Sequence, residues 1–240
     1  MTDRHRFLVG TCSLHDSNEV SVLQYSEDSN HMEAVSLYSH PDQIWAIESS
    51  PTDPSLLVTS RQAFNGSKSL TLWKMDKQST EDIAYGSALY HNEHQELIEL
   101  DSFNPSQKAA YVGTVRWHKT EDKLLSFDGR ILTAWQVSND KVSSIAATMM
   151  TQNESNSFTT ANTAAAWDPH SVHSCAVGCG KQLSVLDVRE LEGGIRREDA
   201  HSGNIRYDCH FTLLLCTYYV NICIYMFSPL IERNMWLNLV

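Results

Sequence analysis

The sequence has 240 residues, of which 42% are hydrophobic and 20% are charged, and its formal net charge is −11. Such a composition is typical of a soluble globular protein long enough to build one or two domains with a sizeable core. The acidic balance argues against nucleic acid as a partner, because binding to a phosphate backbone needs a basic surface.

Four segments share one pattern: apolar, Ser or Thr, apolar, Trp or Leu, polar, apolar. They span residues 20–25, 70–75, 132–137 and 183–188, and Ala134 is the weakest match at the third position. Apolar and polar residues that alternate with a period of two predict half-buried strands. The copies are spaced somewhat more widely than the about 40–45 residues of a four-stranded propeller blade, and the excess can lie in loops.

Each copy has companion strands, most clearly in residues 162–189, where turn residues separate three short runs. One sheet of this size cannot bury both of its faces, so it needs copies of itself beside it. The sequence therefore predicts an all-β propeller of about four blades, at 4–39, 40–100, 110–150 and 161–200. Three first strands are expected at 44–48, 112–117 and 163–167, four second strands at 7–10, 56–59, 123–126 and 174–177, and trailing strands at 34–38, 88–89 or 96–100, 142–147 and 195–198.

Two histidines stand at predicted blade junctions, each four residues before an isoleucine. A histidine there can bond to a hydroxyl or carboxylate of its own blade and tie outer strands to inner ones. Thr59 or Ser60 with Trp73 would complete one such set, and Ser126 with Asp128 and Trp135 another, although no blade shows every member. The predicted structural positions are His40, Trp73, Asp128, Trp135 and His201.

These units resemble WD repeats, and their order is similar to that of the WD-repeat family of the EARP-interacting protein homolog, also called the tumour-suppressing subtransferable candidate type. The matching pieces span roughly residues 4–206: they are 6–11 with Ser13-Leu14, His40 with Ile44-Trp45 and Ser50-Pro51, Leu132 with Trp135, 186–189, and Ala200-His201. The resemblance implies a seven-bladed propeller that acts in endosomal and Golgi trafficking through a tethering complex. With about four blades, the chain is expected to be a C-terminally truncated member.

Within the same resemblance, Leu186-Asp187-Val188-Arg189 is similar to the W-D-x-R ending that marks docking to the adaptor of a cullin-ring ubiquitin ligase. Leu stands where that motif has Trp. Asp187 and Arg189 are two residues apart on a predicted strand and so share a face, where they can instead pair with each other. Partner docking through Asp187 and Arg189, in a substrate receptor for protein ubiquitination, is the alternative to the trafficking scaffold.

The sequence shows no catalytic or cofactor-binding constellation. There is no phosphate-binding glycine loop and no G-x-S-x-G elbow, and residues 91–94 lack the helical H-E-x-x-H setting of a zinc site. The six cysteines form no C-x-x-C pair, which favours reduced residues in a cytosolic protein. We therefore expect a non-enzyme without cofactor or metal.

From residue 207 the composition changes, and residues 211–231 carry no charge. Three interpretations remain open: the abnormal end of a truncated product, which we favour, apolar strands packed on the open propeller edge, or a membrane anchor, whose basic flanks would be poor. The N-terminus shows no signal-peptide pattern. We expect a cytoplasmic protein, peripheral at endosome or trans-Golgi membranes and attached to them indirectly.

Overall fold

The computed structural model describes residues 4–76, 94–104, 112–150, 163–179, 181–189, 194–197 and 200. All of its regular elements are β-strands, in three sheets. The strands are β1 (Arg4–Gly10), β2 (Asn18–Ser26), β3 (His31–His40), β4 (Gln43–Ser49), β5 (Leu56–Gln62), β6 (Lys68–Met75), β7 (Gln95–Phe103), β8 (Thr114–Trp117), β9 (Lys123–Phe127), β10 (Ile131–Ser138), β11 (Lys141–Met149), β12 (Thr163–Trp167), β13 (Ser174–Cys179), β14 (Gln182–Asp187) and β15 (Ile195–Arg197). The second of the two alternatives for the trailing strand after residue 75 is thus confirmed, since β7 contains residues 96–100.

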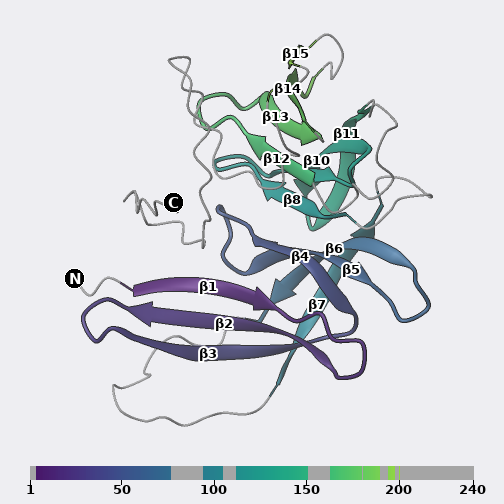
Figure 1. The fold of residues 1–240 in the computed structure, drawn as a ribbon. Coiled ribbons are helices and arrows are strands. Elements are labelled where there is room, and N and C mark those ends of the chain that lie inside the picture. The colour runs from purple at the N-terminus through teal and green to yellow at the C-terminus, as the bar shows by residue number, and fades with distance from the viewer. Residues whose placement is uncertain are drawn as a thin grey trace.

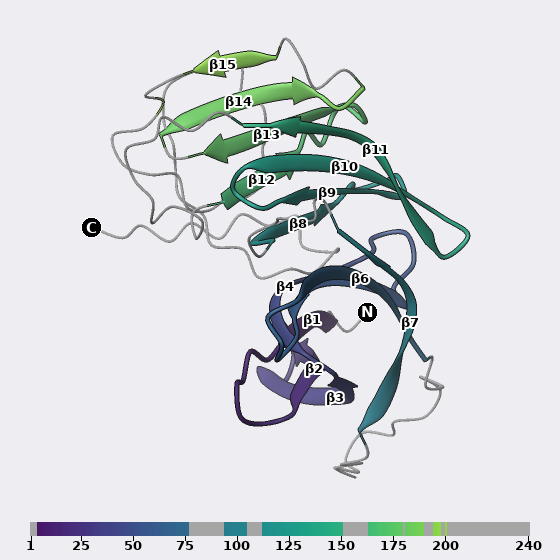
Figure 2. The same cartoon turned by 90° about the vertical axis from the view of Figure 1, so that its right-hand side faces the viewer.

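The strands form four antiparallel units that follow one another along the chain (Figure 1). The first unit is β1–β3, the second β4–β7, the third β8–β11 and the fourth β12–β15. A two-residue parallel bridge between β3 and β7 joins the first two units into one seven-stranded sheet. Figure 2 shows the third and fourth units stacked face to face above the first two. The predicted all-β propeller architecture is confirmed.

Turn residues set the register of the hairpins. Asn139 and Asp140 both have positive φ, 50° and 61°, between β10 and β11. Two such residues in a two-residue turn match the right-handed twist of the flanking strands, and Asn and Asp tolerate this conformation better than other side chains. Gly66 and Gly129 have φ of 83° and 89° in the turns before β6 and β10, where a side chain would be strained.

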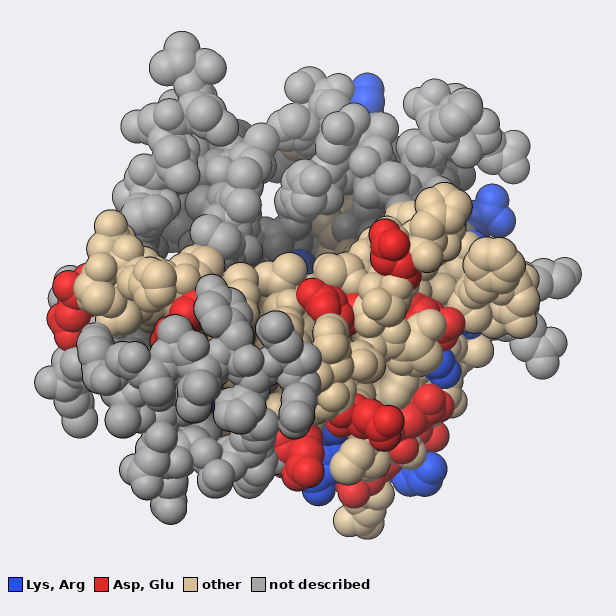
Figure 3. Space-filling view, turned by 90° about the horizontal axis from the view of Figure 1, so that it is seen from below, with Lys and Arg blue, Asp and Glu red and all other residues tan. Residues whose placement is uncertain are grey.

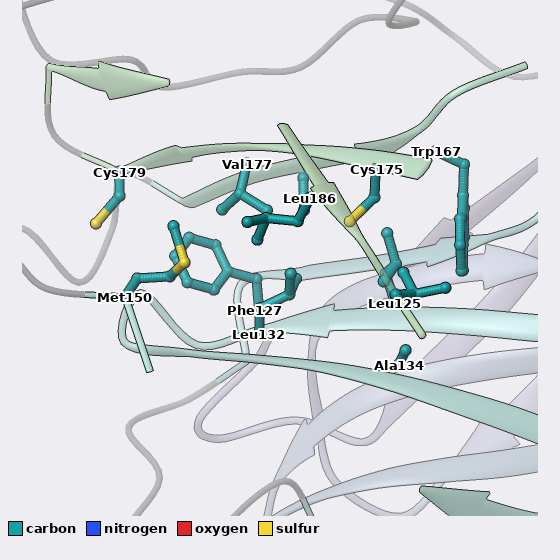
Figure 4. Close-up of a cluster of buried hydrophobic side chains, with 12 residues drawn as sticks. Leu125, Phe127, Leu132, Ala134, Met150, Trp167, Cys175, Val177, Cys179 and Leu186 are labelled. Atoms are coloured by element: carbon teal, nitrogen blue, oxygen red, sulfur yellow. The ribbon is translucent and has the colours of Figure 1, made fainter. Parts of the chain in front are cut away.

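Each interface between neighbouring units holds its own apolar cluster. The largest lies between the third and fourth units and contains Phe127, Leu132, Val177 and Leu186, which Figure 4 shows pointing toward one another from both sheets. A second cluster joins the second and third units, and a third joins the first and second. Because each sheet buries a face against its neighbour, the units stabilise one another as the sequence repeats predicted.

Candidate functional site

A buried polar tie joins the end of the first unit to the second unit, and we define it as His40, Thr59 and Trp73. His40 ends β3, Thr59 lies in the middle of β5, and Trp73 lies on β6. The hydroxyl of Thr59 accepts a hydrogen bond of 2.8 Å from the Trp73 indole nitrogen and lies 3.1 Å from Nε2 of His40. His40 and Trp73 also meet edge to face, with ring centroids 5.2 Å apart. The tie links the end of one unit to the middle strands of the next.

Charged groups flank this polar tie. Burial lowers the pKa of His40, and its Nδ1 lies 2.7 Å from the carbonyl of Asp42. A neutral ring that donates from Nδ1 to this carbonyl can accept the Thr59 proton at Nε2. Arg61 binds the Asp42 carboxylate at 2.9 Å and lies over the Trp73 ring, 5.5 Å from its centroid. The surroundings therefore hold His40 neutral and Trp73 in place.

The third unit has part of the same arrangement. Trp135 on β10 donates from its indole nitrogen to the hydroxyl of Ser126 on β9, at 2.8 Å. The Asp128 carboxylate accepts bonds from the backbone N–H groups of Arg130 and Ile131, at 2.8 and 2.6 Å. Asp128 therefore stabilises the β9–β10 turn, while Trp135 and Ser126 tie the two strands.

The first and fourth units are apolar at these positions. The strand registers place Val177 and Leu186 of the fourth unit where the second has Thr59 and Trp73. In the first unit Val9 and Leu23 take the same places. His201, the remaining predicted structural position, lies outside the described residues, and the roles proposed for the other four rest on the contacts given above.

Side chains also connect neighbouring units near the first strands. The Glu48 carboxylate on β4 accepts a 2.7 Å bond from the backbone N–H of Trp117 on β8. The indole nitrogen of Trp167 on β12 donates to the carbonyl of Arg116, at 3.0 Å. One peptide unit, Arg116–Trp117, thus receives side chains from both neighbouring units. Burial raises the pKa of Glu48 to about 7, although the Arg116 charge and the Trp117 bond oppose the shift.

Sequence reasoning did not find the role of Glu48. Its only signal was a carboxylate at the end of an apolar strand that is followed by Ser-Ser-Pro. The partner N–H of Trp117 lies 69 positions away along the chain and on another sheet. A contact of this kind depends on how the units pack, which strand patterns do not specify.

Asp187 and Arg189 lie at the end of β14 and just beyond it, and they pair with each other. The Arg189 guanidinium approaches the Asp187 carboxylate to 2.6 Å, and the Arg189 backbone N–H donates to the same carboxylate at 2.9 Å. These bonds hold the pKa of the Asp187 carboxyl well below its ordinary value. The Arg189 side chain is 63% exposed, so the pair presents a guanidinium of fixed orientation at the surface.

In the part of the chain that the structure describes, no three His, Cys, Asp or Glu side chains gather closely enough to hold a metal ion. Cys175 and Cys179 are buried, and burial raises the pKa of Cys175 to about 12, which keeps its thiol protonated. None of the described segments forms an apolar helix of membrane-spanning length. The 207–240 tail and residues 91–93 lie outside the described residues.

Comparison with known proteins gives a consistent result. A family model described as the EIPR1 beta-propeller matches residues 1–227. WD repeat-containing protein DWA2 of Arabidopsis thaliana is 26% identical over 211 residues, which cover 86% of this chain and 55% of that protein. EARP and GARP complex-interacting protein 1 of Homo sapiens is 25% identical, over 85% of this chain and 54% of its own length. The EARP-interacting protein homolog of Gekko japonicus is 26% identical over the same shares.

Proposed function

Because the chain belongs to the EIPR1 beta-propeller family, we propose that it is a non-catalytic scaffold that binds an EARP or GARP complex. The observation that carries this proposal is the family match together with relatives whose names state that interaction. The chain spans about half the length of the curated relatives it matches. Binding of the complex is therefore proposed for the surface that these four units provide.

The geometry supports a scaffold because polar bonds and apolar clusters hold the four units against one another. Glu48 and Trp167 bond to the β8 backbone, and the Asp101 carboxylate on β7 accepts a 2.8 Å bond from the Val142 backbone N–H on β11. A surface whose strands are held by such bonds loses little conformational entropy on binding. This rigidity suits recognition of a large partner.

The charge distribution favours indirect association with membranes. Among the described residues on the face seen from below in Figure 3, acidic side chains predominate over basic ones. Anionic lipid headgroups attract basic segments and repel such a face. We therefore place the protein at endosome or trans-Golgi membranes through its protein partner, as the resemblance to trafficking proteins implies.

The proposal is tested by affinity purification of the tagged full chain from cells, followed by mass spectrometry. EARP or GARP complex subunits should be enriched relative to a tag-only control. A matched variant, Leu125→Asp, places a charge in the fully buried cluster between the third and fourth units and should abolish enrichment by unfolding the scaffold. Absence of every subunit from the folded wild-type sample would refute the proposal.

A ubiquitin-ligase substrate receptor remains the second candidate, because Asp187 fixes the exposed Arg189 guanidinium. The Asp187 carboxylate engages the Nε and Nη2 side of the guanidinium, so the orientation of Arg189 is already fixed before a partner binds. Arg189→Ala should then abolish capture of a ligase adaptor and leave the tethering-complex subunits bound. Arg130→Ala, at an exposed arginine of the β9–β10 turn, is the matched control. Adaptor capture that persists in Arg189→Ala would exclude this docking role.

A further inference from the structure

The turn between the first and second strands is built alike in the second, third and fourth units. Ser50, His118 and Asp168 come directly after the first strands β4, β8 and β12. The backbone N–H of each bonds to the carbonyl of the first residue of the second strand, β5, β9 or β13, at 2.9, 2.8 and 2.9 Å. These three residues therefore hold equivalent positions, and we call them the capping residues.

The side chain of each capping residue accepts hydrogen bonds from backbone N–H groups inside its turn. The Ser50 hydroxyl accepts from residues 52 and 53, at 3.2 and 3.1 Å, and the Asp168 carboxylate accepts from residue 170, at 2.9 Å. In the third unit, Nδ1 of His118 accepts from residues 120 and 121, at 3.2 and 3.1 Å. A ring nitrogen that accepts carries no proton, so His118 is neutral and has its proton on Nε2.

The His118 ring lies in the contact between the third and fourth units. It is 3% exposed and meets the ring of Trp167 on β12 edge to face, with centroids 5.1 Å apart. Its Nε2 is buried and has no hydrogen-bond partner among the described residues. A positive charge on this ring would therefore be both desolvated and unpaired, which is costly in a buried contact.

The charges around the ring favour its neutral form. Burial lowers the pKa of His118, and the positive charges of Lys123 and His173 act in the same direction. The Glu121 charge and the Ser171 carbonyl oppose the shift. Because the folded pKa lies below the ordinary value of 6.5, the stability that the neutral ring contributes is present above about pH 6.5. This stability is lost as the pH falls through the folded pKa.

The other titratable groups near this contact have partners of their own. In the loop 168–173, Asp168 and His170 lie 3.4 Å apart. Glu48 binds the N–H of Trp117, and Asp122 accepts a 2.7 Å bond from a hydroxyl of the second unit. Strand β12 contributes no titratable residue. Of the three capping groups, a hydroxyl, an imidazole and a carboxylate, the imidazole is the one that ordinarily changes its charge between pH 5 and 8.

We propose that His118 makes the contact between the third and fourth units sensitive to acid. A proton on Nδ1 removes the acceptor of two backbone N–H groups and places a charge against Trp167. The turn 118–123 then opens and releases β12 and the loop 168–173. The His173 carbonyl in this loop accepts a 2.7 Å bond from the Val188 N–H, so opening also loosens the end of β14. This inference does not rest on the EARP or GARP proposal.

The test is hydrogen exchange of the full chain, followed by mass spectrometry at pH 7.5 and pH 5.5. Rates are expressed as protection relative to an unstructured peptide, so that the effect of pH on the exchange chemistry cancels. Protection of segments 118–123 and 163–168 should fall about tenfold at pH 5.5, because the ring of an open turn gains its proton over this range while the capping ring does not. The turn 50–56, capped by Ser50, should keep its protection.

Matched variants identify the titrating group. His118→Asn keeps an oxygen that can accept from the turn but cannot gain the proton, so its protection should be the same at both pH values. His118→Ser carries the capping group of the second unit and should behave in the same way. His173→Asn removes a neighbouring histidine that caps no turn, and its protection should still fall about tenfold. His40, whose pKa burial also lowers, belongs to the tie in the second unit, and its titration should not act on segment 118–123.

Three results would overturn the proposal. One is unchanged protection of segments 118–123 and 163–168 in the wild type at pH 5.5. Another is a fall in His118→Asn and His118→Ser as large as in the wild type. The last is a fall that His173→Asn abolishes, because His173 would then be the group that takes the proton.

Discussion

The second and fourth units have the same antiparallel four-strand order but are held together by different chemistry. In the second unit, Trp73 and His40 both bond to the buried hydroxyl of Thr59. In the fourth, Val177 and Leu186 occupy the equivalent strand positions and pack in the apolar cluster of Figure 4. The blade architecture thus requires that apolar and polar residues alternate along its strands. At the equivalent positions of neighbouring strands, either polar bonds or apolar packing can join the side chains.

The comparison predicts that apolar packing, rather than a buried hydroxyl, stabilises the fourth unit at these two positions. Leu186 is 1% exposed within its cluster. Leu186→Ala should lower the free energy of unfolding by about 3 kcal/mol, because it removes buried methyl groups and leaves a cavity. Urea denaturation followed by circular dichroism measures the loss. Leu183→Ala, on the other face of β14, is the control, and an equal loss there would show that burial in the cluster does not decide the cost.

In the second unit, the free energy of unfolding should instead depend on the hydroxyl of Thr59. Thr59→Val keeps the shape of the side chain but leaves the buried Trp73 indole N–H without its acceptor and Nε2 of His40 without its donor. We expect a loss of about 2 kcal/mol, since each unsatisfied buried group carries a desolvation penalty. Thr59→Ser retains the hydroxyl and should lose less. Equal losses for the two variants, measured by the same denaturation, would contradict a structural role for the bonds.

Glu48 makes the contact between the second and third units depend on pH. Its folded pKa of about 7 lies above the ordinary value of 4.5, so the native state binds the proton more tightly than the unfolded chain. Stability from this group is present below about pH 4.5 and is lost as the pH rises through 7. Glu48→Gln should therefore be more stable than wild type by about 1–2 kcal/mol at pH 8, and the advantage should shrink as the pH falls and vanish at about pH 4. Thermal unfolding at both pH values decides this, and a constant difference would refute it.

The opposite substitution, which introduces a hydroxyl into the fourth unit, should have the smallest effect on the free energy of unfolding. Val177→Thr introduces a hydroxyl directly opposite Ser184, whose own buried hydroxyl has no hydrogen-bond partner among the described residues. The two hydroxyls can bond across the strands, so we expect a change of about 1 kcal/mol or less. Val177→Ala, which removes two buried methyl groups without adding a polar group, should be clearly worse. A Thr variant as unstable as the Ala variant would show that no such bond forms.

Strand periodicity alone predicted most of the architecture. The alternating segments 70–75, 132–137 and 183–188 lie in β6, β10 and β14. Successive side chains of a strand point to opposite faces of the sheet, so an apolar residue at every second position gives one buried face. The roles expected of Trp73 and Trp135 followed from the same register, and both indoles do bond to a hydroxyl on the adjacent strand.

What the sequence by itself determined about this protein is therefore local: the strands, their turns and the order of the units. The tertiary structure decided which groups meet between units, such as Glu48 with the Trp117 backbone and Trp167 with the Arg116 carbonyl. The physical reason is that strand formation depends on residues two apart, whereas packing of one sheet on another joins residues about 50 to 70 positions apart.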